Sequence, residues 1–337
     1  MLAAQYMSPH SVKAVEAEMP SPASGEALIR VSLCGICGTD LAIEAGKHPR
    51  AQSGLILGHE FCGEIVEINA SGSEFRVGNQ VTVYPLITCG KCLVCRTGNP
   101  HVCRDLKLYG IDAPGGMAAY VSVPVEVLLK LPDSMSAKAG ALLEPYAVGI
   151  HAVRRSPVQP DDTVVVIGAG PIGLLNALAL RELGVEKVFV TDINPFRLGL
   201  VEKSGLLALD AANDDPVKRI LEVTDGEGAD VVFEAAGSQS AAVMMTELVR
   251  CHGTLINVSV FKTPPEVDMR TVNFKELTVI GTRVYTVEDF QTAIDTVDHL
   301  PIDNVVTHQL PLADVTDAFE VFKAGVDVCK VLVDTAE

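Results

Sequence analysis

The sequence predicts an α/β protein with two parts: a doubly wound parallel sheet and an irregular β-rich domain. Three observations carry this prediction. A continuous apolar run at residues 163–167 is followed by a glycine-rich turn and a helical pattern. Strand and helix patterns alternate after it, whereas short strands separated by turn residues fill the first 150 residues. The length of 337 residues also suits about two domains.

The β-rich part is predicted from short strand patterns. They lie at residues 27–31, 64–68, 80–84 and 119–123, with Gly, Pro, Asn and Ser between them. The pattern changes at residues 157–162, a polar stretch with two prolines. We therefore place a domain boundary near residue 150.

The doubly wound part begins with the run at 163–167, which is apolar throughout, as expected for a strand buried on both faces. A helix is predicted at 171–183, and Gly184 stands where a glycine commonly ends a helix. Further strands are predicted at 187–192, 229–234 and 253–258, with a helix at 195–203. The last segment is predicted to hold a helix at 287–300 and a strand at 330–333.

Composition and charge exclude several classes of function. The net charge of −17 repels nucleic-acid phosphates and anionic lipid, so we expect neither a nucleic-acid partner nor a membrane. No apolar run approaches the roughly 20 residues of a membrane span, and the first residues lack the order of a secretion signal. Nine cysteines without a secretion signal favour reduced thiols, so we expect a cytoplasmic protein without a disulfide framework.

The glycine-rich turn indicates a dinucleotide site. It has the pattern GxGxxG between a buried strand and a helix, which is the context that gives this otherwise weak motif its meaning. The first glycine allows the tight turn, the second lets a pyrophosphate approach the backbone, and the third lets the helix pack on the strand. The expected contacts are Gly168, Gly170, Pro171, Ile172 and Gly173.

An acidic residue at the end of the second strand indicates the cofactor. Asp192 follows Gly173 by 19 residues, near the spacing of a carboxylate that binds the adenosine ribose. Such a carboxylate repels a 2′-phosphate, so NAD is expected rather than NADP. Arg197 is the nearby residue that favours NADP, because a guanidinium can bind a 2′-phosphate. We also expect Ala236, Val258 and Val260 to contact the cofactor.

Four clustered cysteines indicate a structural zinc. Cys89, Cys92, Cys95 and Cys103 lie in one lobe, at about residues 86–106, and four thiolates suit a closed tetrahedral site. A zinc ribbon that binds nucleic acid is the rival use of such a cluster, but the negative charge and few aromatic residues argue against it.

A second, dispersed set of ligand types suggests a catalytic zinc. It consists of Cys37, His59, Glu60 and Glu144. Mixed ligands suit a metal that keeps one position open for water or substrate. Spacing alone does not join these residues, because a His-Glu pair is more often an ordinary pair of surface residues.

These motifs together resemble the zinc-dependent medium-chain alcohol and polyol dehydrogenases over essentially the whole chain. The residues that carry the resemblance are Gly35–Asp40, Gly58–Glu64, the four-cysteine lobe, Glu144-Pro145 and the glycine-rich turn, in that order. The resemblance implies that residues 1–150 and 284–337 form a GroES-like catalytic domain, and that residues 151–283 form a Rossmann domain that binds NAD. It also implies a homodimer or a homotetramer.

The resemblance implies roles for the dispersed residues. Cys37 and His59 correspond to direct zinc ligands, Glu60 to a ligand or near-ligand, and Glu144 to the glutamate of sorbitol-dehydrogenase-like members. Thr39 corresponds to the hydroxyl that takes the substrate proton. Asp40 corresponds to the acid that orients the ligand histidine. Zinc would polarise the substrate hydroxyl while a hydride passes to NAD.

Departures from the family pattern narrow the range of expected substrates. Ala42 stands where many members carry a relay histidine, with His48 a conceivable substitute, and Leu86 replaces a histidine of threonine dehydrogenases. Arg283 corresponds to an arginine that faces the substrate, although it could equally hold the domain junction or a cofactor phosphate. The likeness is greatest to sugar-acid 5-dehydrogenases that act on galactonate or idonate.

The expected function is oxidation of a secondary hydroxyl of a polyol, sugar or sugar acid to a ketone, with NAD as acceptor. Two alternatives stay open. One is a simple secondary-alcohol or amino-alcohol dehydrogenase, and the other is an NAD-binding protein that uses the same scaffold without chemistry.

Overall fold

The computed structural model describes residues 1–336 and divides into two compact units. Unit 1 consists of Met1–Glu144, Thr286–Ile302 and the last segment, from Val306 onward. Unit 2 consists of Pro145–Tyr285 and Asp303–Val305. The chain therefore leaves the first unit, builds the second and returns. Within residues 1–336, no helix has both the length and the apolar character needed to cross a bilayer.

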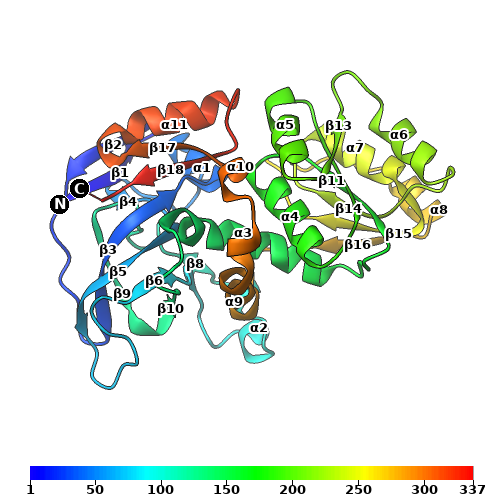
Figure 1. The fold of residues 1–337 in the computed structure, drawn as a ribbon. Coiled ribbons are helices and arrows are strands. Elements are labelled where there is room, and N and C mark those ends of the chain that lie inside the picture. The colour runs from blue at the N-terminus through cyan, green and yellow to red at the C-terminus, as the bar shows by residue number, and fades with distance from the viewer. Residues whose placement is uncertain (337) are drawn as a thin grey trace. The chain divides into compact units, whose positions relative to one another are not determined.

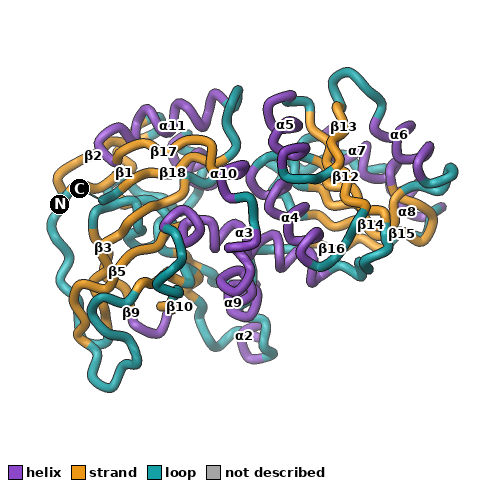
Figure 2. The backbone as a smooth tube through the Cα atoms, in the orientation of Figure 1, coloured by secondary structure: helices purple, strands orange, loops and turns teal. Residues whose placement is uncertain are grey.

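Unit 1 is mostly β-structure joined by long loops, as Figure 2 shows. Its strands are β1 (Leu2–Ser8), β2 (Ser11–Glu16), β3 (Glu26–Gly35), β4 (Leu55–Ile56), β5 (Glu60–Asn69), β6 (Gln80–Val83), β7 (Leu86–Ile87), β8 (Lys107–Leu108), β9 (Tyr120–Pro124), β10 (Leu128–Lys130), β17 (Val306–Pro311) and β18 (Lys330–Asp334). Its α-helices are α1 (Gly38–Glu44), α2 (Leu93–Arg96), α9 (Val287–Thr296) and α11 (Val315–Ala324), and short 3-10 turns lie at Pro100–Val102, Val125–Val127, Val297–His299 and Leu312–Asp314.

The largest sheet of unit 1 positions the residues predicted to be catalytic. Its strand order is β10-β6-β5-β3-β18-β17, and β9 also pairs with β3. The long strand β3 runs antiparallel to both β5 and β18, with Gly35 opposite Glu60 on one side and opposite Leu332 on the other. The sheet thus brings the end of β3, the start of β5 and the start of β18 together, although they come from opposite ends of the sequence (Figure 1).

Unit 2 is a doubly wound α/β domain, as predicted. Its strands β11 (Thr163–Ile167), β12 (Lys187–Asp192), β13 (Leu207–Asp210), β14 (Ala229–Glu234), β15 (Val249–Asn257) and β16 (Thr278–Gly281) form one sheet of order β13-β12-β11-β14-β15-β16. All neighbouring pairs in it are parallel. The strand order reverses between β11 and β14, and ligands of such sheets bind outside the carboxyl ends of the strands at this point.

Helices cover the sheet of unit 2. They are α4 (Pro171–Glu182), α5 (Pro195–Lys203), α6 (Pro216–Val223), α7 (Gln239–Leu248) and α8 (Met269–Phe274). Helices α4 and α5 pack on the β11–β13 half, and α7 packs on β14 and β15 (Figure 1). The buried apolar side chains of β11, β14 and α7 form one core cluster with Ile220 of α6. Two further helices, α3 (Ala137–Arg155) and α10 (Ile302–Val305), run across the division between the units.

Most elements predicted from the sequence are present, but several boundaries are wrong. The strands predicted at 27–31, 64–68 and 253–258 are the longer strands β3, β5 and β15. The predicted helix at 287–300 is α9, which ends at Thr296 and continues only as the 3-10 turn Val297–His299. Pro301 follows Leu300, and the residue before a proline is pushed out of the helical region; Leu300 has φ −82° and ψ 148°. The helix cannot run through this residue. Gly184 follows Leu183, the C-cap of α4, and has a φ of +92°, in agreement with its predicted role.

Candidate functional site

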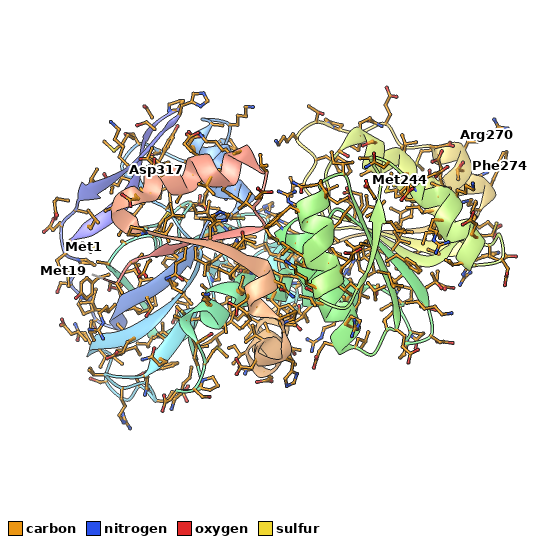
Figure 3. The ribbon with its side chains drawn as sticks, turned by 45° about the horizontal axis from the view of Figure 1, so that its top comes forward. Met1, Met19, Met244, Arg270, Phe274 and Asp317 are labelled. Carbon is orange, nitrogen blue, oxygen red and sulfur yellow. The ribbon has the colours of Figure 1, made fainter. Side chains whose placement is uncertain are left out.

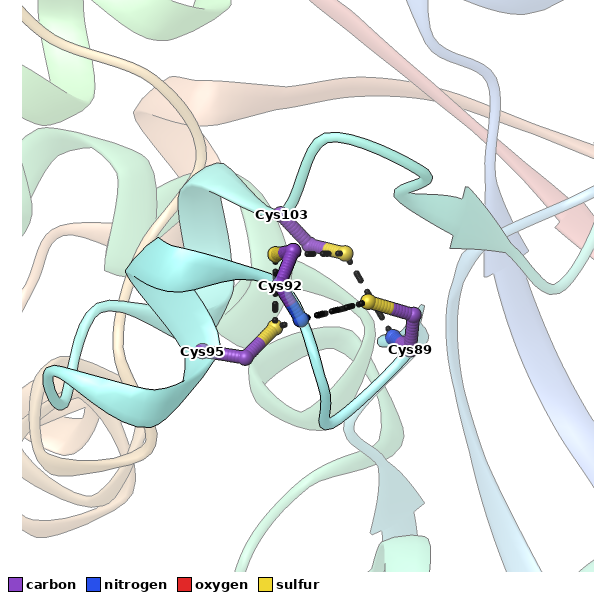
Figure 4. A group of neighbouring side chains, drawn as sticks. All are labelled: Cys89, Cys92, Cys95 and Cys103. Carbon is purple, nitrogen blue, oxygen red and sulfur yellow. Dashed lines mark hydrogen bonds between the residues drawn. The ribbon is translucent and has the colours of Figure 1, made fainter.

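The four clustered cysteines of unit 1 point their sulfur atoms at one another (Figure 4). All four sulfur atoms lie within 4.8 Å of one another. Cys92 Sγ lies 3.4 Å from Cys95 Sγ and 3.9 Å from Cys103 Sγ, and Cys89 Sγ lies 4.0 Å from Cys95 Sγ. Tetrahedral zinc with Zn–S bonds of about 2.3 Å separates its sulfur ligands by about 3.8 Å. The donor set and its spacing therefore fit zinc.

The backbone of this lobe favours the thiolate at two of its four cysteines. The backbone N–H of Cys92 donates to Cys89 Sγ over 3.4 Å, and that of Cys89 donates to Cys103 Sγ over 3.4 Å. Hydrogen bonds from backbone N–H groups lower the pKa of Cys89 and lower that of Cys92 to about 6, whereas desolvation and the neighbouring thiols raise the pKa of Cys95 to about 12. A thiolate is the form that binds metal, so the loop prepares Cys89 and Cys92, and a bound metal would displace the proton of Cys95. All nine cysteines are free thiols, and no disulfide competes with this use.

A second cluster lies where β3, β5 and α1 meet. Donor atoms of Cys37, His59 and Glu60 lie within 4.8 Å of one another, so the fold joins residues that spacing alone could not. Cys37 precedes the first turn of α1, and His59 directly precedes β5. Gly35 makes the approach possible, because a Cβ there would collide with the carboxylate of Glu60. A thiol, an imidazole and a carboxylate at this separation suit zinc.

Asp40 connects two members of this cluster. It is fully buried, and its Oδ2 accepts a 2.8 Å hydrogen bond from the backbone N–H of Cys37. Its Oδ1 lies 4.0 Å from Nδ1 of His59, and neither of these two buried atoms has a hydrogen-bond partner in residues 1–336. Burial raises the pKa of Asp40, although the imidazole opposes the shift. With Nδ1 turned toward Asp40, Nε2 is the nitrogen left for a metal.

Lys330 completes the cluster, and nothing in the sequence pointed to it. It is the first residue of β18, only 2% exposed, and its ammonium forms an ion pair with the equally buried carboxylate of Glu60. Its Nζ also donates to the backbone carbonyl of Ile36 over 2.9 Å. Burial disfavours the ammonium, but Glu60, Cys37 and Glu144 outweigh it and raise the pKa of Lys330. The cluster thus contains a buried cation that balances part of its negative charge.

Glu144 lies beside the cluster rather than within the tight group. It is 7% exposed and sits in α3 directly before Pro145. Burial lowers the pKa of His59, but Cys37 chiefly, with Asp40 and Glu144, outweighs burial and raises it. The Glu144 carboxylate is therefore close enough to act on the imidazole.

The other predicted site residues lie outside this group. Thr39 is half-buried on the first turn of α1, and Ala42 lies one turn later on the same helix. Arg283 is exposed and follows β16 in unit 2.

The glycine-rich turn of unit 2 has the geometry of a phosphate-binding turn. Gly168 has a φ of +101°, which favours glycine, and a Cβ on Gly173 would lie 1.8 Å from the carbonyl oxygen of Gly168. The space beside Gly170, the residue that precedes the first turn of α4, is open. The N-terminus of α4 therefore presents its backbone N–H groups without an obstructing side chain, as anion binding requires.

Asp192 lies at the carboxyl end of β12, beside this turn. Its Oδ2 accepts the backbone N–H of Ala169 over 2.7 Å, and its Oδ1 accepts that of Asn194 over 2.9 Å. A carboxylate has about four acceptor positions, so these two bonds fix its orientation and leave capacity for ribose hydroxyls. Arg197 lies in the first turn of α5, which Asn194 caps. Ala236 and Val260 are exposed in the loops after β14 and β15, and Val258 is buried beside them.

Comparison with known proteins identifies both parts of the chain. Residues 23–133 match the family described as the alcohol dehydrogenase GroES-like domain, and residues 171–299 match the family of zinc-binding dehydrogenases. The chain is 35% identical to 2-dehydro-3-deoxy-L-galactonate 5-dehydrogenase of Pseudoalteromonas atlantica, over 99% of this chain and 98% of that protein. It is also 35% identical to L-galactonate-5-dehydrogenase of Escherichia coli, over 90% of this chain and 89% of that protein.

Solved structures agree with these matches. The chain resembles 2R,3R-butanediol dehydrogenase from Bacillus subtilis with a TM-score of 0.91 and 30% identity, over 99% of each chain. The likeness covers unit 1 and unit 2 alike, so the cluster of Cys37, His59 and Glu60 and the glycine-rich turn both lie inside the shared fold.

Proposed function

Because the chain belongs to the zinc-dependent medium-chain dehydrogenases, we propose that it oxidises a secondary hydroxyl of a sugar acid, sugar or polyol to a ketone, with NAD as hydride acceptor. The observation that carries this proposal is the buried cluster of Cys37, His59 and Glu60, with Glu144 beside it. Two relatives that act on galactonate-type acids favour the sugar-acid members of the class. Residues 1–150 and 284–337 would form the catalytic domain, and residues 151–283 the NAD domain.

We assign the catalytic zinc to Cys37 and His59, with carboxylates from Glu144 and Glu60 completing the set. Glu60 lies in the tight group with Cys37 and His59 and also pairs with the buried ammonium of Lys330. When bound, zinc supplies Lewis acidity that makes the substrate hydroxyl easier to deprotonate. The second zinc would be held by Cys89, Cys92, Cys95 and Cys103, where it ties down a lobe without a core of its own.

The chain's own residues orient the ligands and move the proton. Asp40 holds the backbone of Cys37 through a hydrogen bond and faces the ring of His59, so one buried carboxylate lies against two ligands. The half-buried hydroxyl of Thr39 is the acceptor of the substrate proton in this proposal. Ala42 offers no imidazole to pass that proton on, so it leaves through water or another group.

The cofactor is proposed to bind at the carboxyl ends of β11, β12 and β14. The pyrophosphate would meet the N-terminus of α4 at Gly168–Gly173, and Asp192 would accept hydrogen bonds from the adenosine ribose. The negative charge of Asp192 repels the 2′-phosphate of NADP, which is why NAD is proposed.

We propose that the protein works in the cytoplasm. Its nine cysteines are free thiols, and four of them are arranged for zinc, which favours a reducing compartment.

We also propose that the protein assembles as a homodimer or homotetramer, with one contact along β16. This strand is the edge of its sheet, and Val279 on it is 53% exposed. Phe274 and Met269 of the neighbouring α8 are 70% and 65% exposed, and the guanidinium of Arg270 lies 5.2 Å from the centre of the Phe274 ring (Figure 3). An apolar unpaired edge suits a second copy of the same strand. Light scattering of Val279→Lys, compared with wild type, tests this contact; an unchanged mass contradicts it.

A screen for NADH formation tests the proposed function. The panel contains aldonates, polyols, inositols, threonine and short aliphatic diols, each with NAD and with NADP. We expect turnover with an aldonate or polyol and its loss in Cys37→Ser. Activity confined to short aliphatic alcohols or to threonine would reject the sugar-type substrate. A Cys37→Ser variant with unchanged turnover would reject the catalytic site itself.

A further inference from the structure

Glu234 is a buried carboxylate at the carboxyl end of β14, outside the zinc cluster and the glycine-rich turn. Its exposed fraction is 0%. Its Oε1 accepts the backbone N–H groups of Ala236 and Gly237 over 2.9 and 2.7 Å, and its Oε2 accepts the hydroxyl of Ser259. No basic side chain pairs with it in residues 1–336, so loop donors alone compensate this buried carboxylate.

These donors belong to two loops that follow adjacent strands. Ala236 and Gly237 lie after β14, and Ser259 lies after β15. The main chain of Glu234 reinforces the link, because its carbonyl accepts the N–H groups of Val258 and Ser259 over 2.9 and 3.0 Å. One residue therefore sets the distance between the two loops.

The loop after β14 also touches the glycine-rich turn. A Cβ on Gly168 would lie 3.0–3.1 Å from three atoms of Ala236, and the N–H of Ala235 donates to the carbonyl of Ile167 over 2.9 Å. This contact places the loop after β14 next to the turn proposed to hold the pyrophosphate. The turn itself is held from its other side, because the N–H groups of Gly168 and Ala169 donate to the Thr191 carbonyl and to Asp192 Oδ2, each over 2.7 Å. Glu234 therefore sets the spacing of the loops after β14 and β15 rather than the conformation of the turn.

Topology indicates which half of the cofactor these loops meet. Asp192 ends β12, on one side of β11, whereas β14 and β15 lie on the other side. If the adenosine ribose binds at Asp192 and the pyrophosphate at the turn after β11, the second nucleotide extends over β14 and β15. The exposed Ala236 and Val260 stand at that position.

We propose that Glu234 is a positioning residue for the nicotinamide half of the dinucleotide. It acts through the loops that it holds and does not itself touch the reacting atoms. This inference rests on the proposed NAD function. Loops held in their binding conformation before the ligand arrives have less freedom to lose on binding, so the tie raises affinity for that half of the ligand alone.

The test compares binding of NADH with binding of ADP, which lacks the nicotinamide half, to the zinc-loaded full chain. In Glu234→Ala, we expect the Kd for NADH to rise at least tenfold while the Kd for ADP changes less than twofold. Glu234→Gln keeps an acceptor for both N–H groups and should restore most of the affinity. If Glu234→Ala is insoluble, Ser259→Ala, which removes one donor, should still weaken NADH binding and spare ADP.

Asp230 supplies a matched control at the opposite end of the same strand. It accepts the N–H of Thr163 over 2.8 Å and pairs with Arg250 over 2.6 Å, so it is also a carboxylate that ties strands together. Asp230→Ala should lower thermal stability without changing either Kd. An equal loss of NADH affinity in Asp230→Ala, or equal losses for NADH and ADP in Glu234→Ala, would overturn the proposal. Failure of the wild-type protein to bind NADH would instead contradict the proposed function.

Discussion

Replacing Lys330 with Met tests whether the buried ion pair with Glu60 supports the catalytic cluster. The side chains of Lys330 and Glu60 are 2% and 1% exposed, so water cannot take over the charge of a Glu60 left alone. Removing one partner of a buried pair costs about 3–5 kcal/mol, chiefly because the other charge stays buried without compensation. The loss of the bond from Nζ to the Ile36 carbonyl adds to this cost.

The assay is denaturant unfolding of the zinc-loaded protein, with zinc content measured on the same samples. We expect Lys330→Met to lose about 3–5 kcal/mol of unfolding free energy. The double variant Lys330→Met/Glu60→Gln, which removes both charges, should recover at least half of it. The two changes should therefore show a coupling energy of about 2 kcal/mol or more, as residues in direct contact do.

Arg30 provides the control in the same unit. It pairs with Glu64 over 2.8 Å, but the two side chains are 51% and 31% exposed and solvent can replace the interaction. Arg30→Met should cost no more than about 1 kcal/mol. A loss below about 1 kcal/mol for Lys330→Met, or a double variant no more stable than the single one, would refute the reasoning that the charges of this cluster depend on one another.

Three further predictions concern the metals, the cofactor and acid. The wild-type chain should carry two zinc ions by elemental analysis; Cys92→Ser and Cys37→Ser should each lower the content to one, but only Cys37→Ser should abolish turnover in samples that remain folded. Asp192→Gly should raise the KM for NAD by roughly ten- to a hundredfold and leave NADP less affected, since a hydrogen bond to a charged group contributes about 1.5–3 kcal/mol. Hydrogen bonds from Asn213 and the N–H of Ala212 lower the pKa of Asp210, so its stabilising effect is present above the unfolded-state pKa and is lost as the pH falls through the folded-state pKa. The stability difference between wild type and Asp210→Asn should accordingly be largest near neutral pH and shrink below about pH 4, as measured by urea unfolding at several pH values.

The sequence predicts the doubly wound unit well because its signals are local. The run at residues 163–167 is apolar on both faces, the glycines of the turn follow at once, and Asp192 ends the next strand at a fixed spacing. Each signal is complete within a stretch of about 30 residues, which is the size of one βαβ unit. At Glu144 the local signal gives the wrong element. Its neighbour Pro145 argues against a helix, yet both residues lie inside α3.

The cluster of Cys37, His59 and Glu60 depends on contacts that no local pattern contains. Lys330 follows Glu60 by 270 residues, and they meet only because β18 and β5 pair with opposite sides of β3. Taken alone, a lysine at the start of an apolar strand indicates an ordinary solvated side chain. Its burial against Glu60 changes the meaning of the His59-Glu60 pair, because this carboxylate faces a buried ammonium and not solvent. The charge balance of the cluster is therefore set by the order of strands in the sheet, which brings a strand from the end of the chain beside residues from its first part.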